Sequence, residues 1–477
     1  MKYYLAVLML ALGFAGCSSD DGLLADPAPT GEVDAIVLGV KEVVSPVTRA
    51  QQTGSMTFET LKTTGFGVYG YEGTYSNKSS QPTLFKVGNG VGANTKVEFI
   101  PDGTAPTTSL IAHPGSWKYA ETANLKEWDS SKKYTFFAYA PYVTSADLTS
   151  SGTAGINSIK TVDTAGDPTI GYTVAEDPAE SVDLLWGVRT AYTSGGTTKG
   201  AGLPWIDIKQ GETAAAVQFT FYHALCALGF HAQVMVDQAN DPDKLGDVST
   251  LGTLGDKDGC KVTLRKITIT PAGTPETGSS EAVAAEPFCQ SGVLNLNNTY
   301  AHKPLWSDTS GTITSLVLDN GTGGHGTIDS KLLDPVANTG EDDYYSSGST
   351  LNLNGTKTAV MTNNDVPGIT ETANTQTIIA NDNLFMLIPQ TKQDYTVEVE
   401  YYMTYKTTGP GYHRQSFSGT ATLSDLELVA GVKYYLNLVF GLTTFKLSVD
   451  AVDWEESTTP VTIATETGTS ASQSLAK

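Results

Sequence analysis

The chain has 477 residues and a formal net charge of −22, with 29 lysine and arginine residues against 51 aspartate and glutamate residues. This acidic balance argues against a nucleic-acid binder, because such proteins cluster cations that displace counterions from the phosphates. Only 17% of the residues are charged and 40% are hydrophobic, which excludes a disordered chain and a coiled coil. The many Gly, Thr, Ser, Asn, Val and Tyr residues indicate strands joined by turns.

The N-terminus has the features of an export signal. An apolar run over residues 5–14 follows Lys2 and is shorter than a membrane span. It leads to Ala15, Gly16 and Cys17, a sequence that resembles a bacterial lipobox, although Phe14 departs from the usual leucine. We therefore expect Cys17 to take a diacylglyceryl group and to anchor the protein by its acyl chains. The alternative is an ordinary signal peptide with a chance cysteine.

A polar tether over residues 18–32 follows, and its prolines keep it extended. Its acidic residues directly after Cys17 resemble the surface-export signal of Bacteroidetes lipoproteins, and a solvated linker is the equal alternative. The next segment, 33–44, is predicted to be the first strand because aliphatic residues alternate along it. These are Ile36, Leu38 and Val40.

Period-two alternation is the dominant pattern in the rest of the chain. It predicts strands over 134–140, 395–405 and 434–440, and a C-terminal hairpin that continues with 445–449. No long stretch shows a sustained helical period. The fold class predicted from the residues is therefore all-β, built from antiparallel sandwiches with long loops.

The segment 217–236 contains a change of phase. Apolar residues occupy odd positions from Val217 to Phe221 and even positions from Leu228 to Val236. Because a strand cannot change parity without a bulge or a turn, we predict a strand, one turn and a second strand. His223 lies at the junction, where we interpret it as a structural histidine and keep a catalytic role as the alternative.

Turn-rich sequence near 193–213 separates two strand-rich halves, and the stretch 306–376 is predicted to form long loops. The resulting division is a signal with its lipobox (1–17), a tether (18–32), an N-terminal sandwich (33–206) and a C-terminal sandwich with a tail (207–477).

No catalytic motif was found, so we expect a protein that is not an enzyme and that has no cofactor and no bound metal. The oxygen-rich run 237–243 could ligate calcium but lacks the EF-hand spacing, and a solvated turn is the default interpretation. The glycines of 88–92 are interpreted as a turn between strands. Cys226 is expected to be buried, and whether Cys260 and Cys289 form a disulfide is left open.

Several segments together resemble the fimbrillin family of Bacteroidetes, the subunits of type V pili. Each segment alone is weak, and the resemblance rests on their order and spacing along nearly the whole mature chain. The segments are 47–50 (VTRA), 66–71 (FGVYGY), 117–119 (WKY) with Trp128, 134–141 (YTFFAYAP), 183–187 (DLLWG), 219–225 (FTFYHAL), 387–390 (LIPQ), 431–435 (GVKYY) and 452–454 (VDW).

The resemblance implies two transthyretin-like sandwich domains and transport to the outer membrane as a lipoprotein. It also implies that an arginine-specific protease removes the first strand, and that a strand from the next subunit fills the vacated groove. Arg49 matches the cleavage position, so Ala50 would be the mature N-terminus. The implied partners are other pilus subunits, the outer membrane before assembly, and a host or bacterial surface ligand that stays unidentified.

The donor segment and the place of the subunit in a pilus are left open. Val461 and Ile463 alternate with threonines and could form a short donor strand, whereas 468–477 is polar and is expected to be disordered. The alternative function is a monomeric surface lipoprotein that binds a glycan. Trp306, in the region predicted as loops, could stack on a sugar, whereas Trp186 and Trp205 are expected to fill the core.

Overall fold

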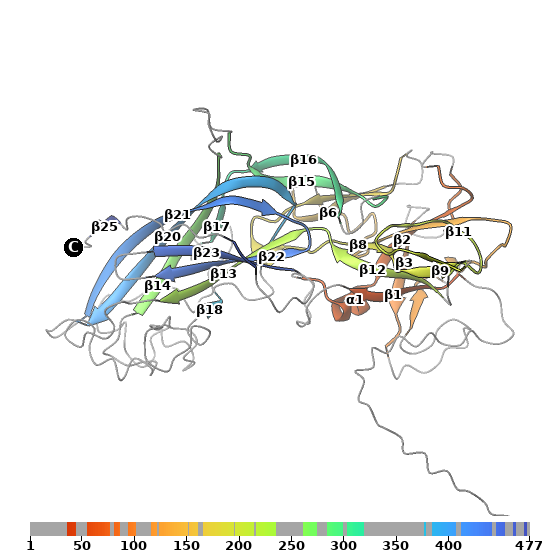
Figure 1. Ribbon diagram of the computed structural model, residues 1–477, viewed down its shortest axis with the longest axis horizontal. Coiled ribbons are helices and arrows are strands. Elements are labelled where there is room, and N and C mark those ends of the chain that lie inside the picture. The colour runs from red at the N-terminus through yellow and green to blue at the C-terminus, as the bar shows by residue number, and fades with distance from the viewer. Residues whose placement is uncertain are drawn as a thin grey trace, which may run out of the picture.

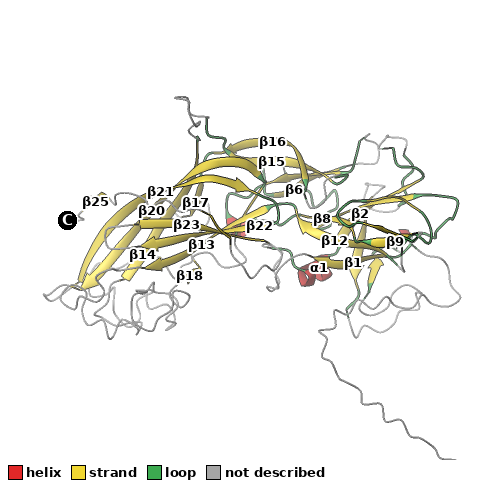
Figure 2. Cartoon of the chain, in the orientation of Figure 1, coloured by secondary structure: helices red, strands yellow, loops and turns green. Residues whose placement is uncertain are grey.

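The computed structural model describes residues 36–43, 55–76, 81–85, 94–101, 116–121, 124–150, 152–160, 166–194, 196–213, 216–234, 261–273, 284–298, 303–318, 376–377, 384–406, 412–440, 445–453, 461–463 and 472–474. Strands dominate these residues, and the molecule is elongated, with sheets gathered toward both ends (Figures 1 and 2). The prediction of an all-β fold is confirmed.

The N-terminal end is built on an eight-stranded sheet with the strand order β1-β12-β8-β5-β2-β3-β4, and β11 pairs with β5. These strands are β1 (Leu38–Val43), β2 (Phe66–Glu72), β3 (Asn94–Phe99), β4 (Trp117–Tyr119), β5 (Tyr134–Ala140), β8 (Leu185–Arg189), β11 (Trp205–Ile208) and β12 (Val217–His223). A hairpin of β9 (Tyr192–Ser194) and β10 (Thr197–Lys199) stands beside it.

Both faces of this sheet are covered, which explains why every residue of β5 is buried. Phe136 and Ala138 point into one apolar core, which also holds the buried side chains of β1 and of a short helix, α1 (Phe58–Thr64). Phe137 and Tyr139 point into a second core, which continues into the C-terminal half. Trp186 and Trp205 are 0% and 1% exposed, so both fill the core as expected.

A four-stranded sheet connects the two halves of the chain. Its order is β16-β15-β7-β6, with β6 (Gly155–Ile159), β7 (Thr169–Thr173), β15 (Phe288–Asn295) and β16 (Leu305–Ile313). A 3-10 turn, η2 (Pro178–Glu180), precedes β8. Because β7 pairs with β15, strands from before and after the centre of the chain share one hydrogen-bonded ladder.

Two sheets form the C-terminal end. One has β13 (Cys226–Val234), β18 (Gln376–Thr377), β19 (Phe385–Leu387), β22 (Val432–Phe440), β23 (Phe445–Asp453) and β24 (Val461–Ile463). The other has β14 (Lys261–Ala272), β17 (Leu316–Leu318), β20 (Gln390–Lys406), β21 (Tyr412–Leu428) and β25 (Ser472–Ser474). The sheets pack face to face, since a Cβ added to Gly419 of β21 would lie 2.9 Å from the Cβ of Phe445 of β23.

The period-two patterns predicted these strands correctly because the apolar residues of each strand repeat along a buried face. On β20, Val397 and Val399 are buried, while Glu398 and Glu400, which alternate with them, are exposed. Two pairings among the described strands are parallel rather than antiparallel, β1 with β12 and β13 with β22. Which strand a given strand pairs with, and whether the pair is parallel or antiparallel, depend on residues distant in sequence. A local sequence pattern carries no information about these residues.

The change of phase predicted within 217–236 is the point where the chain crosses from the N-terminal sheet to a C-terminal sheet. β12 ends at His223 in the N-terminal sheet, and β13 begins at Cys226 in a C-terminal sheet. Between them Ala224 and Leu225 are both 0% exposed. The division predicted between residues 206 and 207 stays a prediction, although β12 lies after it and pairs with β8 before it.

Two expectations for polar segments are wrong. The start of the predicted loop region 306–376 forms β16 and β17 instead, while 319–375 lie outside the described residues. Part of the tail predicted to be disordered, 468–477, forms β25 on the edge of β21. Strands at a sheet edge pair through backbone groups, so neither segment needed the apolar alternation by which strands were recognised.

Candidate functional site

The first strand closes the N-terminal sheet. β1 pairs in parallel with β12, with Leu38 opposite Val217 and Val40 opposite Phe219. On its other side lies β4, the opposite end of the strand order, because the hydroxyl of Tyr119 donates a hydrogen bond to the Ile36 carbonyl at 2.9 Å. The sheet therefore curls until its two end strands meet. We call the gap between β12 and β4, which β1 fills, the first-strand seat.

The side chains of this segment explain why it occupies the seat. Ile36, Leu38 and Val40 are 0%, 2% and 1% exposed, whereas Lys41 points to solvent. Burying an aliphatic side chain of this size contributes about 1.5–3 kcal/mol. The alternation predicted from the sequence is thus the set of contacts that holds β1 in the core.

Backbone hydrogen bonds extend the attachment before β1 begins. The Ile36 N–H donates to the Lys126 carbonyl at 2.7 Å, and the Val217 N–H donates to the Val37 carbonyl at 2.8 Å. An ideal Cβ on Gly39 would lie 4.0 Å from Cδ1 of Trp117, so the strand runs close along β4. Main-chain groups and alternate side chains both recognise the segment, which is how an added strand is bound.

Helix α1 lies beside β1 (Figure 1) and contributes to the same core. Thr57 caps it, because its side chain accepts a hydrogen bond from the Thr60 N–H at 3.1 Å. Met56 and Leu61 are 4% and 0% exposed and belong to the core that holds the β1 side chains. The helix was not predicted, because seven residues are too few for a sustained helical period.

A buried contact between Asp183 and His223 lies where α1 meets the sheet. Asp183 precedes β8, and its Oδ2 is 2.7 Å from Nδ1 of His223, with the two side chains 0% and 1% exposed. The same Oδ2 accepts a hydrogen bond from the Met56 N–H at 2.8 Å. His223 thus has a buried partner in Asp183, which agrees with the interpretation of His223 as a structural histidine. In the sequence, Asp183 was named only as part of the DLLWG segment. No local pattern predicted its contacts with Met56 and His223.

The residues expected to be lipidated or cut lie in segments that the structure does not describe. Cys17, Arg49 and Ala50 all lie outside the described residues. The elements on either side of Arg49 are described. β1 ends at Val43, the description resumes at Ser55, and α1 begins at Phe58. The turn over 88–92 and the oxygen-rich run 237–243 also lie outside the described residues.

The two cysteines in the described part of the chain are Cys226 and Cys289, and burial makes the thiols of both less reactive. Cys226 is buried, and burial raises the pKa of its thiol to about 12, which keeps it protonated. Cys289 is half-buried, and burial raises the pKa of its thiol as well. Both are free thiols in the described part of the chain, and Cys260 lies outside it, so the Cys260–Cys289 pairing stays a prediction.

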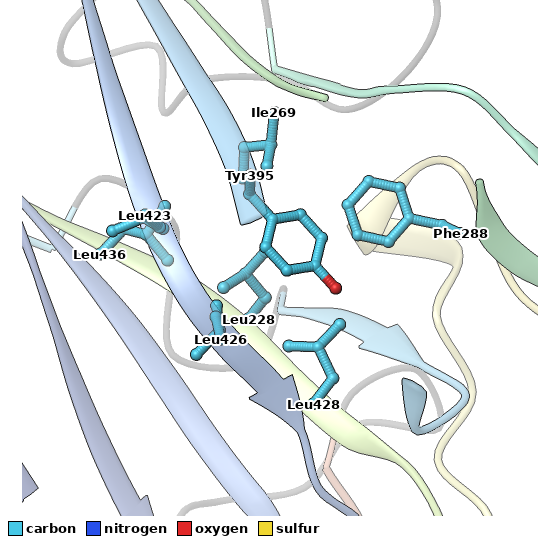
Figure 3. Close-up of a pocket in the computed structure, with 8 residues that line it drawn as sticks. All are labelled: Leu228, Ile269, Phe288, Tyr395, Leu423, Leu426, Leu428 and Leu436. Carbon is cyan, nitrogen blue, oxygen red and sulfur yellow. The ribbon is translucent and has the colours of Figure 1, made fainter. Parts of the chain in front are cut away.

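A small apolar pocket lies between the two C-terminal sheets (Figure 3). The hydroxyl of Tyr395, the polar atom among its lining side chains, accepts a hydrogen bond from Nε2 of Gln393 at 3.2 Å. Leucines and Phe288 provide most of the wall, so the pocket carries no group for acid–base chemistry. Its lining residues are Leu228, Ile269, Phe288, Tyr395, Leu423, Leu426, Leu428 and Leu436.

Trp306, proposed as a sugar-stacking residue, is half-buried on β16. Its ring Nε1–H donates to the Ala224 carbonyl at 2.9 Å, and its ring meets that of Tyr172 edge to face. Within the described residues, no three His, Cys, Asp or Glu side chains gather as metal ligands. None of the helices described is long and apolar enough to cross a membrane.

The chain is 27% identical over 225 residues to fimbrium subunit Fim1C of Phocaeicola vulgatus. The resemblance to the fimbrillin family is confirmed. The match covers 46% of this fimbrillin-like chain and 48% of the curated relative, so the chain spans about half the length of that relative. No model of a known protein family matches it.

Solved structures similar to this chain include two from Bacteroides species. A fimbrial protein from Bacteroides vulgatus has a TM-score of 0.49 and 17% identity, and the alignment covers 88% of this chain and 99% of that one. A candidate cell adhesion protein from Bacteroides uniformis has a TM-score of 0.35 and 14% identity, with 89% and 99% of the two chains covered.

Proposed function

We propose that this chain is a structural and adhesive pilus subunit, exported as an outer-membrane lipoprotein on Cys17, cut after Arg49, and assembled by donor-strand exchange. The observation that carries the proposal is the first-strand seat. A terminal strand fills a core position with buried aliphatic side chains, and the chain between that strand and α1 contains Arg49. The sequence similarity to a fimbrium subunit supports the same function.

The positions of the arginines support cleavage at this point. Arg189, Arg265 and Arg414 lie within β8, β14 and β21, whereas Arg49 lies between β1 and α1. Proteases bind their substrates as extended segments and attack connections far more readily than paired strands. An arginine-specific protease would therefore cut this chain after Arg49 and separate β1 from the rest of the molecule.

Loss of β1 would create a binding site for a replacement strand. It would expose the core beside Val217 and Phe219 and leave backbone groups of β12 unpaired. Each buried backbone group without a partner costs about 1–3 kcal/mol, so the empty seat favours any strand that restores these bonds. A segment of a second subunit with aliphatic residues at alternate positions has the matching chemistry.

The test is replacement of Arg49. We expect the Arg49→Ala protein to fold, to reach the cell surface and to stay monomeric, because β1 remains covalently held in its seat. Arg49→Lys is the matched control: it keeps the positive charge, and an arginine-specific protease leaves it uncut. Mass spectrometry should find Ala50 as the N-terminus of the wild-type protein, and gels of surface material should show ladders for the wild type only.

Two outcomes would overturn the proposal. Ladders formed by Arg49→Ala would show that assembly does not need the cut. A wild-type protein recovered from cells as an uncut monomer with its lipidated N-terminus would instead support the glycan-binding lipoprotein, which binding to a panel of oligosaccharides would then examine.

A further inference from the structure

We propose that Asp183, held by His223, is a positioning residue that fastens the chain at Met56, so that α1 stays in place when β1 is cut away. This inference rests on the proposed cleavage after Arg49. It assigns a task to the buried Asp183–His223 contact, which the strand-exchange scheme itself does not require, and it defines where the removable part of the chain ends.

The first step of the argument is the position of the anchor. The Met56 N–H is hydrogen-bonded to Oδ2 of Asp183 at 2.8 Å and directly precedes the helix cap Thr57. Arg49 lies before this contact, and β1 lies before Arg49. After cleavage, Met56 is thus held by Asp183 on the mature side of the cut, while β1 is on the other side.

The second step is the rigidity of the anchor. Asp183 is flanked by Leu184 and β8, and His223 is the last residue of β12, so the 2.7 Å contact between Oδ2 and Nδ1 joins two paired strands at their ends. The Asp183 side chain is 0% exposed, so water does not compete for the hydrogen bond that the Met56 N–H donates to it, and a buried donor left without a partner bears the full cost of its desolvation. The Met56 N–H therefore binds to an acceptor that the sheet itself holds in place.

The third step is what α1 does once β1 has left. Met56 and Leu61 lie in the same core as Ile36, Leu38 and Val40. They would form part of the wall against which an incoming strand packs. Without the hydrogen bond between Met56 and Asp183, the new N-terminal end created by the cut would be free to enter the first-strand seat, and α1 would be free to leave the core. Asp183 thereby keeps the seat open and shaped for a strand from another subunit.

The experiment compares the protection of α1 in intact and cut protein. The full chain and its variants Asp183→Asn, Asp183→Leu and His223→Gln are cut after Arg49 by an added arginine-specific protease, and the released segment that contains β1 is separated from the rest of the chain. Hydrogen exchange at residues 57–65 is then measured by mass spectrometry before and after the cut. We expect wild-type protection to survive the cut, because Asp183 still holds Met56.

In the variants, the cut should lower protection of α1 by about tenfold or more, the scale of losing one buried hydrogen bond. Before the cut the loss should be small, because the covalent link to β1 still restrains the helix. Asp183→Asn, which keeps a neutral acceptor, should lose less than Asp183→Leu. If Asp183→Leu does not fold, Asp183→Asn and His223→Gln carry the comparison.

Asn124→Ala is the matched control. Asn124 is buried and donates from Nδ2 to Oγ1 of Thr95 at 2.9 Å, so the variant loses a buried hydrogen bond that does not touch Met56. Its α1 protection should respond to the cut as the wild type does. An equal loss in intact and cut Asp183 variants, or no loss in either, would overturn the anchor.

This result is separable from the proposed function. If Arg49 resists the protease, the processing step fails, and a variant with a second protease's site at 50–53 supplies the cut for the anchor test. If the anchor fails while wild-type ladders form, strand exchange stands without it.

Discussion

Gly187 lies where neighbouring strands of the N-terminal sheet approach each other closely. It lies on β8 between β5 and β12, where an added Cβ would be 2.7 Å from the Cβ of Ala138 and 3.0 Å from Cε1 of Phe221. Both neighbours are 0% exposed and belong to the core of the sheet. The smallest residue is therefore required here by space.

We expect Gly187→Ala to lower the free energy of unfolding by about 1–3 kcal/mol, because overpacking forces neighbouring strands apart. The midpoint of urea denaturation of the uncut protein measures this. Gly200→Ala is the control, since nothing lies within 4 Å of its added Cβ, and we expect little change or a small gain. Equal losses at both sites would mean that crowding is not the cause.

Among the elements, β1 is the one whose contribution should depend on the state of assembly. In the uncut subunit, Leu38→Ala should cost about 2–5 kcal/mol, because it leaves a cavity in the core beside Val217. Lys41→Ala, at an exposed position of the same strand, should change stability by no more than about 0.5 kcal/mol. Urea denaturation of the Arg49→Ala background measures both.

If assembly removes β1, as we propose, the Leu38→Ala effect should vanish in assembled material. Polymers from Leu38→Ala cells should dissociate at the same denaturant concentration as wild-type polymers. A persistent difference would mean that β1 stays in the pilus.

The sequence predicted those elements whose structure is set locally. Strands such as β5, β20 and β22 were found because their apolar residues repeat with the period of a half-buried or buried strand. The short helix α1 and the edge strand β16 lack such a repeat. Within the site, Ile36, Leu38 and Val40 were identified, whereas Asp183 and Met56 are 127 positions apart and meet only in the fold.

At the scale of the whole molecule, buried tyrosines make stability depend on alkaline pH. Burial is the main cause that raises the pKa of Tyr69, Tyr119, Tyr139 and Tyr172 above the ordinary 10.0, and it raises that of Tyr395 to about 12. Above pH 10 the unfolded chain loses protons that the folded chain keeps. Stability is therefore fully present below pH 10 and falls as the pH rises.

We expect cooperative unfolding at alkaline pH, in which most phenolate absorbance appears together with the loss of the circular dichroism of the sheets. Exposed tyrosines titrate first and leave the dichroism unchanged. Full phenolate absorbance with the sheets still intact would contradict the prediction.

The crossover between β12 and β13 has a mechanical consequence. Ala224 and Leu225 are buried, and their backbone groups are hydrogen-bonded to Leu184, Trp306 and Gly431. A connector this short and this firmly bonded restricts bending, so we expect the two ends of the subunit to tilt and twist as one body. A fibre of such subunits would flex only where one subunit joins the next, and its stiffness would be set at those joints.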